Sequence, residues 1–176
     1  MQTITLGGGC FWCTEAVFVE VIGVTDVVSG YTNGHTVNPS YEQICDGNTG
    51  HAEVVRVRFD SDVISLADIL GIFFAIHNPT TLNQQGADRG TQYRSAIFVH
   101  SLAQREFAEQ MIARLNTEKI WDAPIVTEVA DAATFYAAED YHQEYFKQNP
   151  NQGYCMAVVS PKVAKFRKSF VSLLKP

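Results

Sequence analysis

The chain has 176 residues, of which 46% are hydrophobic and 18% are charged. This length and composition fit one globular domain with a substantial core, and they exclude collagen-like, coiled-coil and disordered chains. Thirteen Lys and Arg against nineteen Asp and Glu give a formal net charge of -6. No basic run is long enough to follow a phosphate backbone, so we expect no nucleic-acid partner.

The longest apolar stretches, such as residues 69–76, are far shorter than the roughly 20 residues that span a bilayer. The N-terminus lacks the basic and apolar regions of a secretory signal. We therefore expect a cytoplasmic monomer without a membrane segment. Four cysteines are too few for a disulfide scaffold, and in a reducing compartment they are more often catalytic, metal-binding or buried.

Strand-like and helix-like patterns alternate along the chain, with two polar loops at 32–50 and 80–92. No repeat or linker interrupts them, so we expect one catalytic domain over 1–176. Its predicted fold class is α+β: a two-layer α/β sandwich with a ferredoxin-like core, a mixed sheet and long irregular loops. In the first half of the chain the patterns predict a strand at 3–6, a helix at 11–21, strands at 24–31 and 51–59, and a helix at 66–77. In the second half they predict a strand at 93–99, a helix that is capped by Ser101 and runs to about residue 116, and a strand at 125–130. A helix at 132–147 and a strand or extended segment at 154–159 complete the predicted order.

The strongest local signal is Gly-Gly-Gly-Cys-Phe-Trp-Cys at residues 7–13, at a predicted strand-to-helix turn. Glycines before a helix allow backbone N–H groups to converge on a sulfur, and a helix N-terminus stabilises a thiolate. Cys10 is therefore a candidate nucleophile with a lowered pKa. Cys13 lies one helical turn later, within reach of Cys10 for a disulfide.

Two other interpretations of this motif remain open. A strand, a turn, Cys-x-x-Cys and a helix in that order are also typical of thioredoxin-like thiol-disulfide oxidoreductases. A non-enzymatic alternative is a zinc-binding or redox-sensing interaction module in which Cys10 and Cys13 hold metal. Zinc would need two further ligands, and Cys45, Cys155 and the five histidines offer no second closely spaced pair. Redox chemistry is therefore favoured over zinc binding.

Glu53 is a candidate acid. The alternation of its strand places it on the same face as Val55, Val57 and Phe59. A carboxyl on such an apolar face would be desolvated, its pKa would rise toward neutrality, and it could donate a proton. The alternative is that Glu53, close to a strand end, points to solvent.

The residues after the nucleophile, Phe11 and Trp12, are either core residues or a hydrophobic wall for a small apolar group of a substrate. Tyr41, Asp88 and Tyr93 lie in or beside the two polar loops. They can supply hydroxyl and carboxylate hydrogen bonds, although such residues are also common on ordinary turns.

Several motifs occur together in a specific order. They are Gly-Cys-Phe-Trp at 9–12, Asn-Pro-Ser-Tyr at 38–41, Thr-Gly-His-Ala-Glu-Val-Val at 49–55 and Gly-Thr-Gln-Tyr-Arg-Ser at 90–95, with further segments at 77–80, 83–88, 138–143 and 153–155. In this order they resemble the A type of the peptide methionine sulfoxide reductase family. The resemblance covers nearly the whole chain, and a chance match of several ordered motifs is much rarer than a chance Cys-x-x-Cys.

The resemblance implies a reductase of the S epimer of methionine sulfoxide, free or in proteins, that uses thiols and no metal or organic cofactor. Thioredoxin is the family's usual reductant and is therefore the expected partner. The site residues that the resemblance implies are the nucleophile Cys10, the acid Glu53 near the sulfoxide oxygen with its assistants Tyr41 and Tyr93, the hydrogen-bonding Asp88, and Phe11 and Trp12 around the substrate's methyl group.

The chemistry of sulfoxide reduction is consistent with these roles. Attack of a thiolate on the sulfur leaves negative charge on oxygen, for which a protonated carboxyl and two phenols are suitable donors. Loss of the oxygen yields methionine and a sulfenic acid on Cys10, which a second thiol converts to a disulfide.

The second thiol is either Cys155 or Cys13. Cys155 matches the family's Gly-Tyr-Cys position, and we favour it as the first resolving cysteine. Cys13 stands where the family often has Gly, and it could close a small ring with Cys10 without any loop movement; the two could also act in relay. The further cysteine that some members carry in a Gly-rich C-terminal tail has no counterpart in this sequence.

Overall fold

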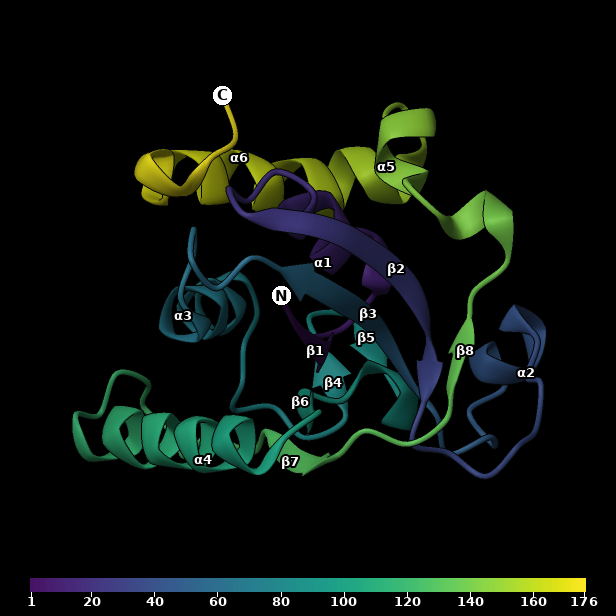
Figure 1. The fold of residues 1–176 in the computed structure, drawn as a ribbon. Coiled ribbons are helices and arrows are strands. Elements are labelled where there is room, and N and C mark those ends of the chain that lie inside the picture. Colours follow the sequence, from purple (N-terminus) through teal and green to yellow (C-terminus); the bar gives the residue numbers. More distant parts are fainter.

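The computed structural model describes all residues from Met1 to Pro176. A six-stranded sheet runs through its centre in the order β7-β6-β1-β3-β2-β8 (Figure 1). Strands β6 and β7 pair in parallel and all other neighbours are antiparallel, so the sheet is mixed, as predicted. The strands are β1 (Gln2–Gly7), β2 (Val24–Thr32), β3 (Ala52–Phe59), β6 (Ala96–Val99), β7 (Glu128–Asp131) and β8 (Phe135–Ala137).

The main core lies between one face of this sheet and four helices. On β3 the alternating residues Val55, Val57 and Phe59 enter it, because successive side chains of a strand point to opposite faces. A smaller apolar cluster around Val54 and Phe98 lies apart from this core. The two-layer α+β prediction is therefore confirmed. The helices are α1 (Phe11–Phe18), α3 (Leu66–Ile76), α4 (Leu102–Thr117) and α6 (Ser160–Ser169).

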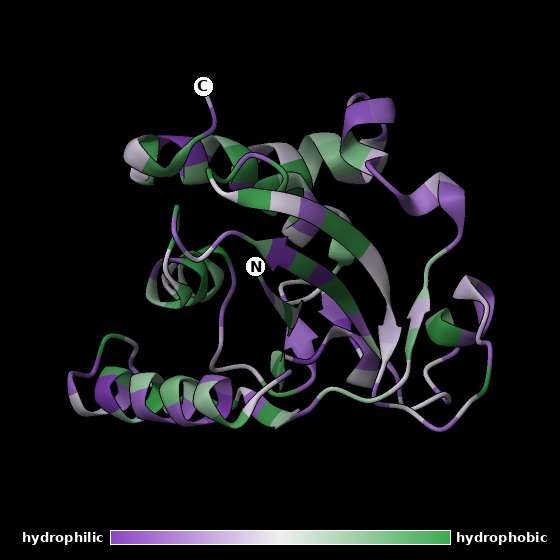
Figure 2. Cartoon of the chain, in the orientation of Figure 1, coloured by the Kyte–Doolittle hydropathy of each residue, from purple (hydrophilic) through white to green (hydrophobic).

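Serine caps mark the starts of two of these four helices, α3 and α4. The Ser65 side chain accepts a hydrogen bond from the backbone of Asp68 at 3.0 Å, and Ser101 accepts one from the backbone of Gln104 at 3.2 Å. Along α4 the buried residues Gln104, Ala108 and Met111 recur every three or four positions, and hydrophilic residues alternate with them (Figure 2). This helix therefore turns one face to the core.

Both predicted polar loops contain short regular elements. The first holds α2 (Tyr41–Cys45), which begins with a reciprocal capping box between Ser40 and Gln43. The second holds the small hairpin β4 (Gln84–Gln85) with β5 (Asp88–Arg89), followed by the 3-10 helix η1 (Thr91–Tyr93). Tyr93 therefore lies on a helical turn, and the strand expected from residue 93 begins only at Ala96.

The prediction of a helix over 132–147 is wrong. That segment forms β8, the 3-10 helix η2 (Asp140–His142) and the short helix α5 (Tyr145–Gln148). β8 pairs with the edge of β2, where Gly30 lies opposite Ala137. A Cβ atom at Gly30 would lie 2.5 Å from the carbonyl oxygen of Tyr136, so this pairing depends on glycine. A tertiary contact thus overrides the local helical pattern.

The predicted strand at 154–159 is also wrong. It is the π-helix η3 (Cys155–Val159), which continues directly into α6. A short apolar run does not by itself distinguish a buried strand from a helix, and Pro161 is compatible with the first turn of α6. None of the helices has the length and hydropathy needed to cross a membrane.

Candidate active site

Cys10 lies at the N-cap of α1, directly after β1 and its glycines. Gly9 adopts a φ of +89°, which L side chains rarely adopt, and a Cβ atom there would lie 2.8 Å from Cγ of Gln85. The glycine is therefore needed both for the turn and for the close approach of the β4–β5 hairpin. Together these features place the Cys10 sulfur at the junction of strand, helix and hairpin.

The expectation of a lowered Cys10 pKa is wrong. Burial raises the pKa of the Cys10 thiol well above its ordinary value, and the negative charges of Glu53 and Cys13 raise it further. The backbone N–H of Trp12 bonds to the sulfur and acts in the opposite direction. Helix α1 has only eight residues, so its N-terminus does not outweigh the loss of water and the nearby carboxylate.

Glu53 points into the protein, and the solvent-facing alternative is wrong. Its side chain is only 1% exposed, and Tyr31 is its cross-strand neighbour on β2. One carboxyl oxygen, Oε1, accepts a hydrogen bond from the backbone N–H of Phe11 at 3.3 Å, whereas the buried Oε2 has no partner. Burial raises the pKa of Glu53 to about 8; the Phe11 bond opposes this rise and the charge of Asp88 adds to it. Glu53 is therefore protonated at neutral pH, as the sequence predicted for a desolvated carboxyl.

Two phenols approach the same carboxyl from the two polar loops. Tyr41 is the first residue of α2, and Tyr93 is the last residue of η1. Burial raises the pKa of both hydroxyls, and the negative charges of Glu53 and Cys10 raise it further. Both side chains therefore remain protonated and can donate hydrogen bonds near Cys10.

Phe11 and Trp12 form an aromatic wall beside the nucleophile. Phe11 is buried against Tyr31, with ring centroids 5.7 Å apart. Trp12 is half-buried and stacks on Tyr145 at 3.8 Å, and its Nε1–H donates to Nδ1 of His142 at 3.0 Å. The structure thus makes Phe11 a core residue and leaves part of Trp12 accessible.

His142 and Tyr145 were not among the predicted site residues. They lie in the segment wrongly predicted as one long helix, and only the ordered motif at 138–143 indicated that this segment matters. Their contacts with Trp12 hold the indole in one orientation. Cys45 is exposed on α2 and forms a side-chain hydrogen bond with Tyr41.

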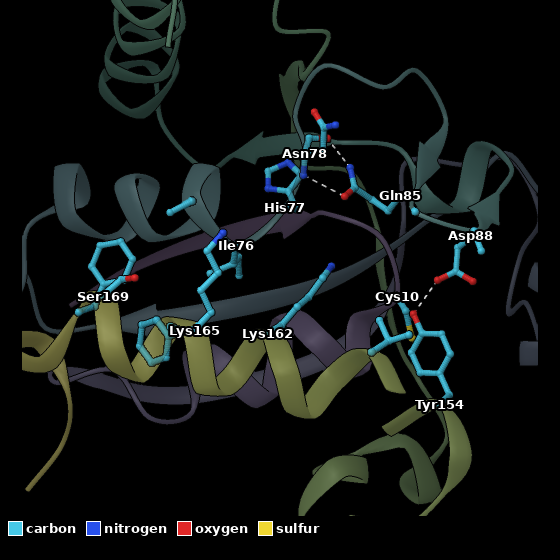
Figure 3. A pocket seen from close by; sticks show the side chains of 16 residues that line it. Cys10, Ile76, His77, Asn78, Gln85, Asp88, Tyr154, Lys162, Lys165 and Ser169 are labelled. Carbon is cyan, nitrogen blue, oxygen red and sulfur yellow. Dashed lines mark hydrogen bonds between the residues drawn. The ribbon is translucent and has the colours of Figure 1, made fainter. Parts of the chain in front are cut away.

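A cavity of about 460 Å³ opens beside Cys10, between the end of α3, the β4–β5 hairpin and α6 (Figure 3). Asp88 lines it and accepts a hydrogen bond from the hydroxyl of Tyr154 at 2.6 Å. Gln85 closes the hairpin side, where its Oε1 accepts a hydrogen bond from the backbone N–H of Asn78 at 3.0 Å. Asp88 therefore shares one cavity with the nucleophile, as expected for a member of its hydrogen-bond network.

The two candidate resolving cysteines are both buried, and all four cysteines are free thiols. Burial raises the pKa of Cys13 to about 11, although the charge of Lys162 and a hydrogen bond with Tyr154 act against the rise. The charge of Cys13 raises the pKa of Cys10, and the charge of Cys155 raises that of Cys13. The backbone N–H of Cys13 donates a hydrogen bond to the carbonyl oxygen of Cys10 at 3.1 Å. Cys10 and Cys13 therefore share one turn, and Cys155 lies close enough to Cys13 for its charge to act on it.

The structure brings Cys10, Glu53, Tyr41, Tyr93 and Asp88 to one place, and their charges act on one another. No group of three or more His, Cys, Asp and Glu side chains is arranged to hold a metal ion. The site thus combines a buried thiol, a protonated carboxyl, two phenols and the further thiols of Cys13 and Cys155. This set can transfer protons and exchange disulfides.

Comparison with known proteins identifies the family. The sequence profile of the peptide methionine sulfoxide reductase family matches residues 2–173. The chain belongs to this family. A curated relative, the peptide methionine sulfoxide reductase MsrA of Polynucleobacter asymbioticus, is 57% identical over 176 residues, which cover 100% of this chain and 93% of the relative. The resemblance inferred from the ordered motifs is confirmed.

Solved structures of the family have the same fold. The reduced form of Mxr1 from Saccharomyces cerevisiae superposes with a TM-score of 0.80 at 37% identity, and 88% of each chain is covered. Mxr1 in complex with Trx2 superposes with a TM-score of 0.56 at 28% identity, covering 82% of this chain and 84% of Mxr1. The thioredoxin-like alternative is not favoured, because the matched motifs and the fold both extend far beyond Cys10-x-x-Cys13.

Proposed function

We propose that this chain reduces the S epimer of methionine sulfoxide, free or within proteins, to methionine, with thiols as its only redox groups. Family membership supports the reaction class. The observation that carries the assignment of the site is the burial of a protonated Glu53 beside Cys10. Its Oε1 accepts the hydrogen bond from Phe11, and its Oε2 has no partner in the protein. That oxygen can donate to a sulfoxide oxygen, which is where negative charge develops.

In the proposed first step, the sulfur of Cys10, which its raised pKa holds as a thiol in the resting site, loses its proton and attacks the sulfoxide sulfur. The released proton later restores the acid form of Glu53. The oxygen receives the proton of Glu53 and hydrogen bonds from Tyr41 and Tyr93, and methionine leaves as Cys10 becomes a sulfenic acid. The sulfoxide is reduced and Cys10 is oxidised by the same two electrons. The accessible part of Trp12 receives the methyl group, and its apolar surface accounts for the choice of a dialkyl sulfoxide. Phe11, which is buried in the core, contributes through its backbone hydrogen bond to Glu53.

In the proposed recycling steps, Cys13 reacts with the sulfenic acid to give a Cys10–Cys13 disulfide and water. The thiolate of Cys155 then attacks Cys13, which releases Cys10 and leaves a Cys13–Cys155 disulfide for an external dithiol to reduce. The shared turn of Cys10 and Cys13, together with the effect of the Cys155 charge on Cys13, supports this order over Cys155 as the first resolver.

We propose thioredoxin as the external dithiol. The support is the solved complex of the relative Mxr1 with Trx2, a thioredoxin. We further propose that residues 1–176 act as one catalytic domain, as a monomer in the cytoplasm, where a dithiol reductant is available.

The testing experiment measures methionine formation from the separated S and R epimers of N-acetyl-methionine sulfoxide methylamide, with dithiothreitol as reductant. We expect turnover of the S epimer alone, and none by the matched variant Cys10→Ser. Turnover of the R epimer would contradict the stereochemistry. No turnover of either epimer by folded protein with free thiols would contradict the reaction and the roles assigned to Glu53, Tyr41 and Tyr93.

A further inference from the structure

Two lysines of α6 enter the cavity beside Cys10 without an ion-pair partner. Lys162 and Lys165 both project from the helix into the space facing His77 and the end of α3 (Figure 3). Neither ammonium nitrogen lies within 4.0 Å of a carboxylate oxygen, whereas Arg167 on the same helix pairs with Glu20 at 2.6 Å. The chain as a whole carries a net charge of -6, so this is a local excess of positive charge.

The other titratable side chains of the cavity do not cancel that excess. Asp88 lies at the Cys10 end, where the Tyr154 hydroxyl already binds it. His77 is buried, and burial together with the charge of Lys162 lowers its pKa to about 4, so it is neutral at pH 7. The charge of Lys162 also lowers the pKa of Cys13. Its field therefore reaches from the middle of the cavity to the reacting thiols.

The cavity is also larger than the reaction centre requires. Its volume of about 460 Å³ falls within the range of about 300–1,000 Å³ typical of ligand sites. Cys10 and Asp88 occupy one end, and Ser169 marks the opposite end (Figure 3). The two lysines lie between these ends (Figure 3), and the lining also includes the apolar side chain of Phe166. A polypeptide that presents its sulfoxide at Cys10 could thus continue along α6.

We propose that this cavity is a subsite for the residues next to methionine sulfoxide in a peptide, and that it selects Asp or Glu side chains there through Lys162 and Lys165. The proposal rests on the proposed reductase function and adds a substrate class to it. Acidic carboxylates are the partners that an unpaired pair of ammonium groups favours, and basic flanking residues would be repelled.

The expected selectivity is modest. Ion pairs at partly exposed sites contribute on the order of 0.2–1 kcal/mol, which corresponds to a change of about 1.4- to 5-fold per lysine in kcat/KM. Because the Debye length shrinks from about 10 Å at 0.1 M salt to about 3 Å at 1 M salt, the selectivity should fall as salt is added. A preference between peptides that arose from apolar contacts or from shape would persist at high salt.

The test is a competition in one vessel between two peptides that differ only in the residues beside methionine sulfoxide, Asp in one and Lys in the other. Competition reports the ratio of kcat/KM and cancels the shared recycling steps, so dithiothreitol serves as reductant. We expect the parent to prefer the Asp peptide about 2- to 10-fold. Lys162→Gln/Lys165→Gln should abolish the preference, and Lys162→Glu/Lys165→Glu should reverse it.

Lys168→Glu is the matched control, because it changes the charge of the same helix outside the cavity; it should leave the ratio unchanged. Should the double charge reversal fail to fold, the exposed position alone, Lys165→Glu, should still lower the ratio. Equal use of both peptides by the parent, or a preference that survives Lys162→Gln/Lys165→Gln, would overturn the subsite while the reductase function stands.

Two further outcomes of these experiments would each refute the subsite in a different way. If neither peptide is reduced, both the reductase function and the subsite are refuted. If the lysine variants slow only thioredoxin-driven turnover and leave the peptide ratio under dithiothreitol unchanged, the lysines act in docking the reductant and the peptide subsite is wrong.

Discussion

The backbone N–H of Phe11 donates a hydrogen bond to Oε1 of Glu53 at 3.3 Å and thereby joins the first turn of α1 to strand β3. The residue next to the nucleophile thus orients the carboxyl from a strand more than forty positions away. Because Oε1 is occupied, Oε2 is the oxygen left to act on a substrate. Several expected outcomes depend on this arrangement.

Glu53→Gln should slow the reductive half-reaction by about 10²- to 10⁴-fold, the usual contribution of a positioned general acid. Burial raises the pKa of Glu53 to about 8, so the parent holds the proton below that pH and loses it above. The difference between parent and variant should therefore be largest below pH 8 and narrow above it. Single-turnover methionine release from pH 5.5 to 9.5 measures this, with the exposed Glu42→Gln as control. If Glu53→Gln were as fast as the parent over the whole pH range, Glu53 would not be the general acid.

The same substitution should stabilise the fold at neutral pH. The folded-state pKa of Glu53 is raised from 4.5 to about 8, so protonation favours the folded state and stability is lost as the pH rises from about 4.5 to 8. Gln carries no charge and avoids this loss. Urea unfolding should show a gain on the order of 1–3 kcal/mol at pH 7.5 and little difference near pH 4.5. A constant difference at the two pH values would show that Glu53 is not the titrating group.

Removal of the Glu53 charge should also lower the pKa of Cys10. After burial, Glu53 is the largest cause of the raised Cys10 pKa, and Asp88 is the smallest of those identified. The alkylation rate of Cys10 against pH, with mass spectrometry to locate the label, should shift to lower pH in Glu53→Gln. Asp88→Asn should give a smaller shift in the same direction. Identical profiles for parent and Glu53→Gln would mean that the two groups do not interact.

Trp12→Ala should lower kcat/KM about tenfold or more, because the accessible part of the indole is the proposed wall for the methyl group. The stacking on Tyr145 at 3.8 Å and the bond to His142 fix that wall. Steady-state kinetics with the blocked S sulfoxide provide the measurement, and alkylation of Cys10 should remain as fast as in the parent. Unchanged kinetics would contradict a substrate role for Trp12.

Cysteine variants should separate the recycling steps. Cys13→Ser should release one equivalent of methionine and then stop, because the sulfenic acid on Cys10 lacks its neighbouring thiol. Cys155→Ser should accumulate a Cys10–Cys13 disulfide, identifiable by peptide mapping, and should lose thioredoxin-driven turnover. Cys45→Ser is the matched control and should cycle normally. A Cys10–Cys155 disulfide in the Cys13→Ser variant would instead support Cys155 as the first resolver.

The features that were predicted correctly from the amino-acid sequence are those that depend on local signals. The glycines before Cys10 predicted the strand-to-helix turn, the serines at 65 and 101 predicted two helix starts, and the alternation of β3 predicted an apolar face for Glu53. Each prediction rests on hydrogen bonds or periodicity within a few residues, so no distant contact was needed. The ordered motifs also identified the family.

The remaining features depend on contacts between residues that are far apart in the chain. The segment 132–147 does not form the predicted helix because β8 pairs with the edge of β2 at Gly30. This arrangement places His142 within hydrogen-bonding distance of Trp12. The pKa of Cys10 is raised above its ordinary value, whereas the local motif predicted a lowered pKa. The causes are burial and the charge of Glu53, which depend on packing and are not encoded in a local motif. The unpaired Lys162 and Lys165 became cavity residues because α6 crosses beside the nucleophile (Figure 3). In each case the deciding interaction joins residues far apart in the chain, and its strength depends on how much water their packing excludes.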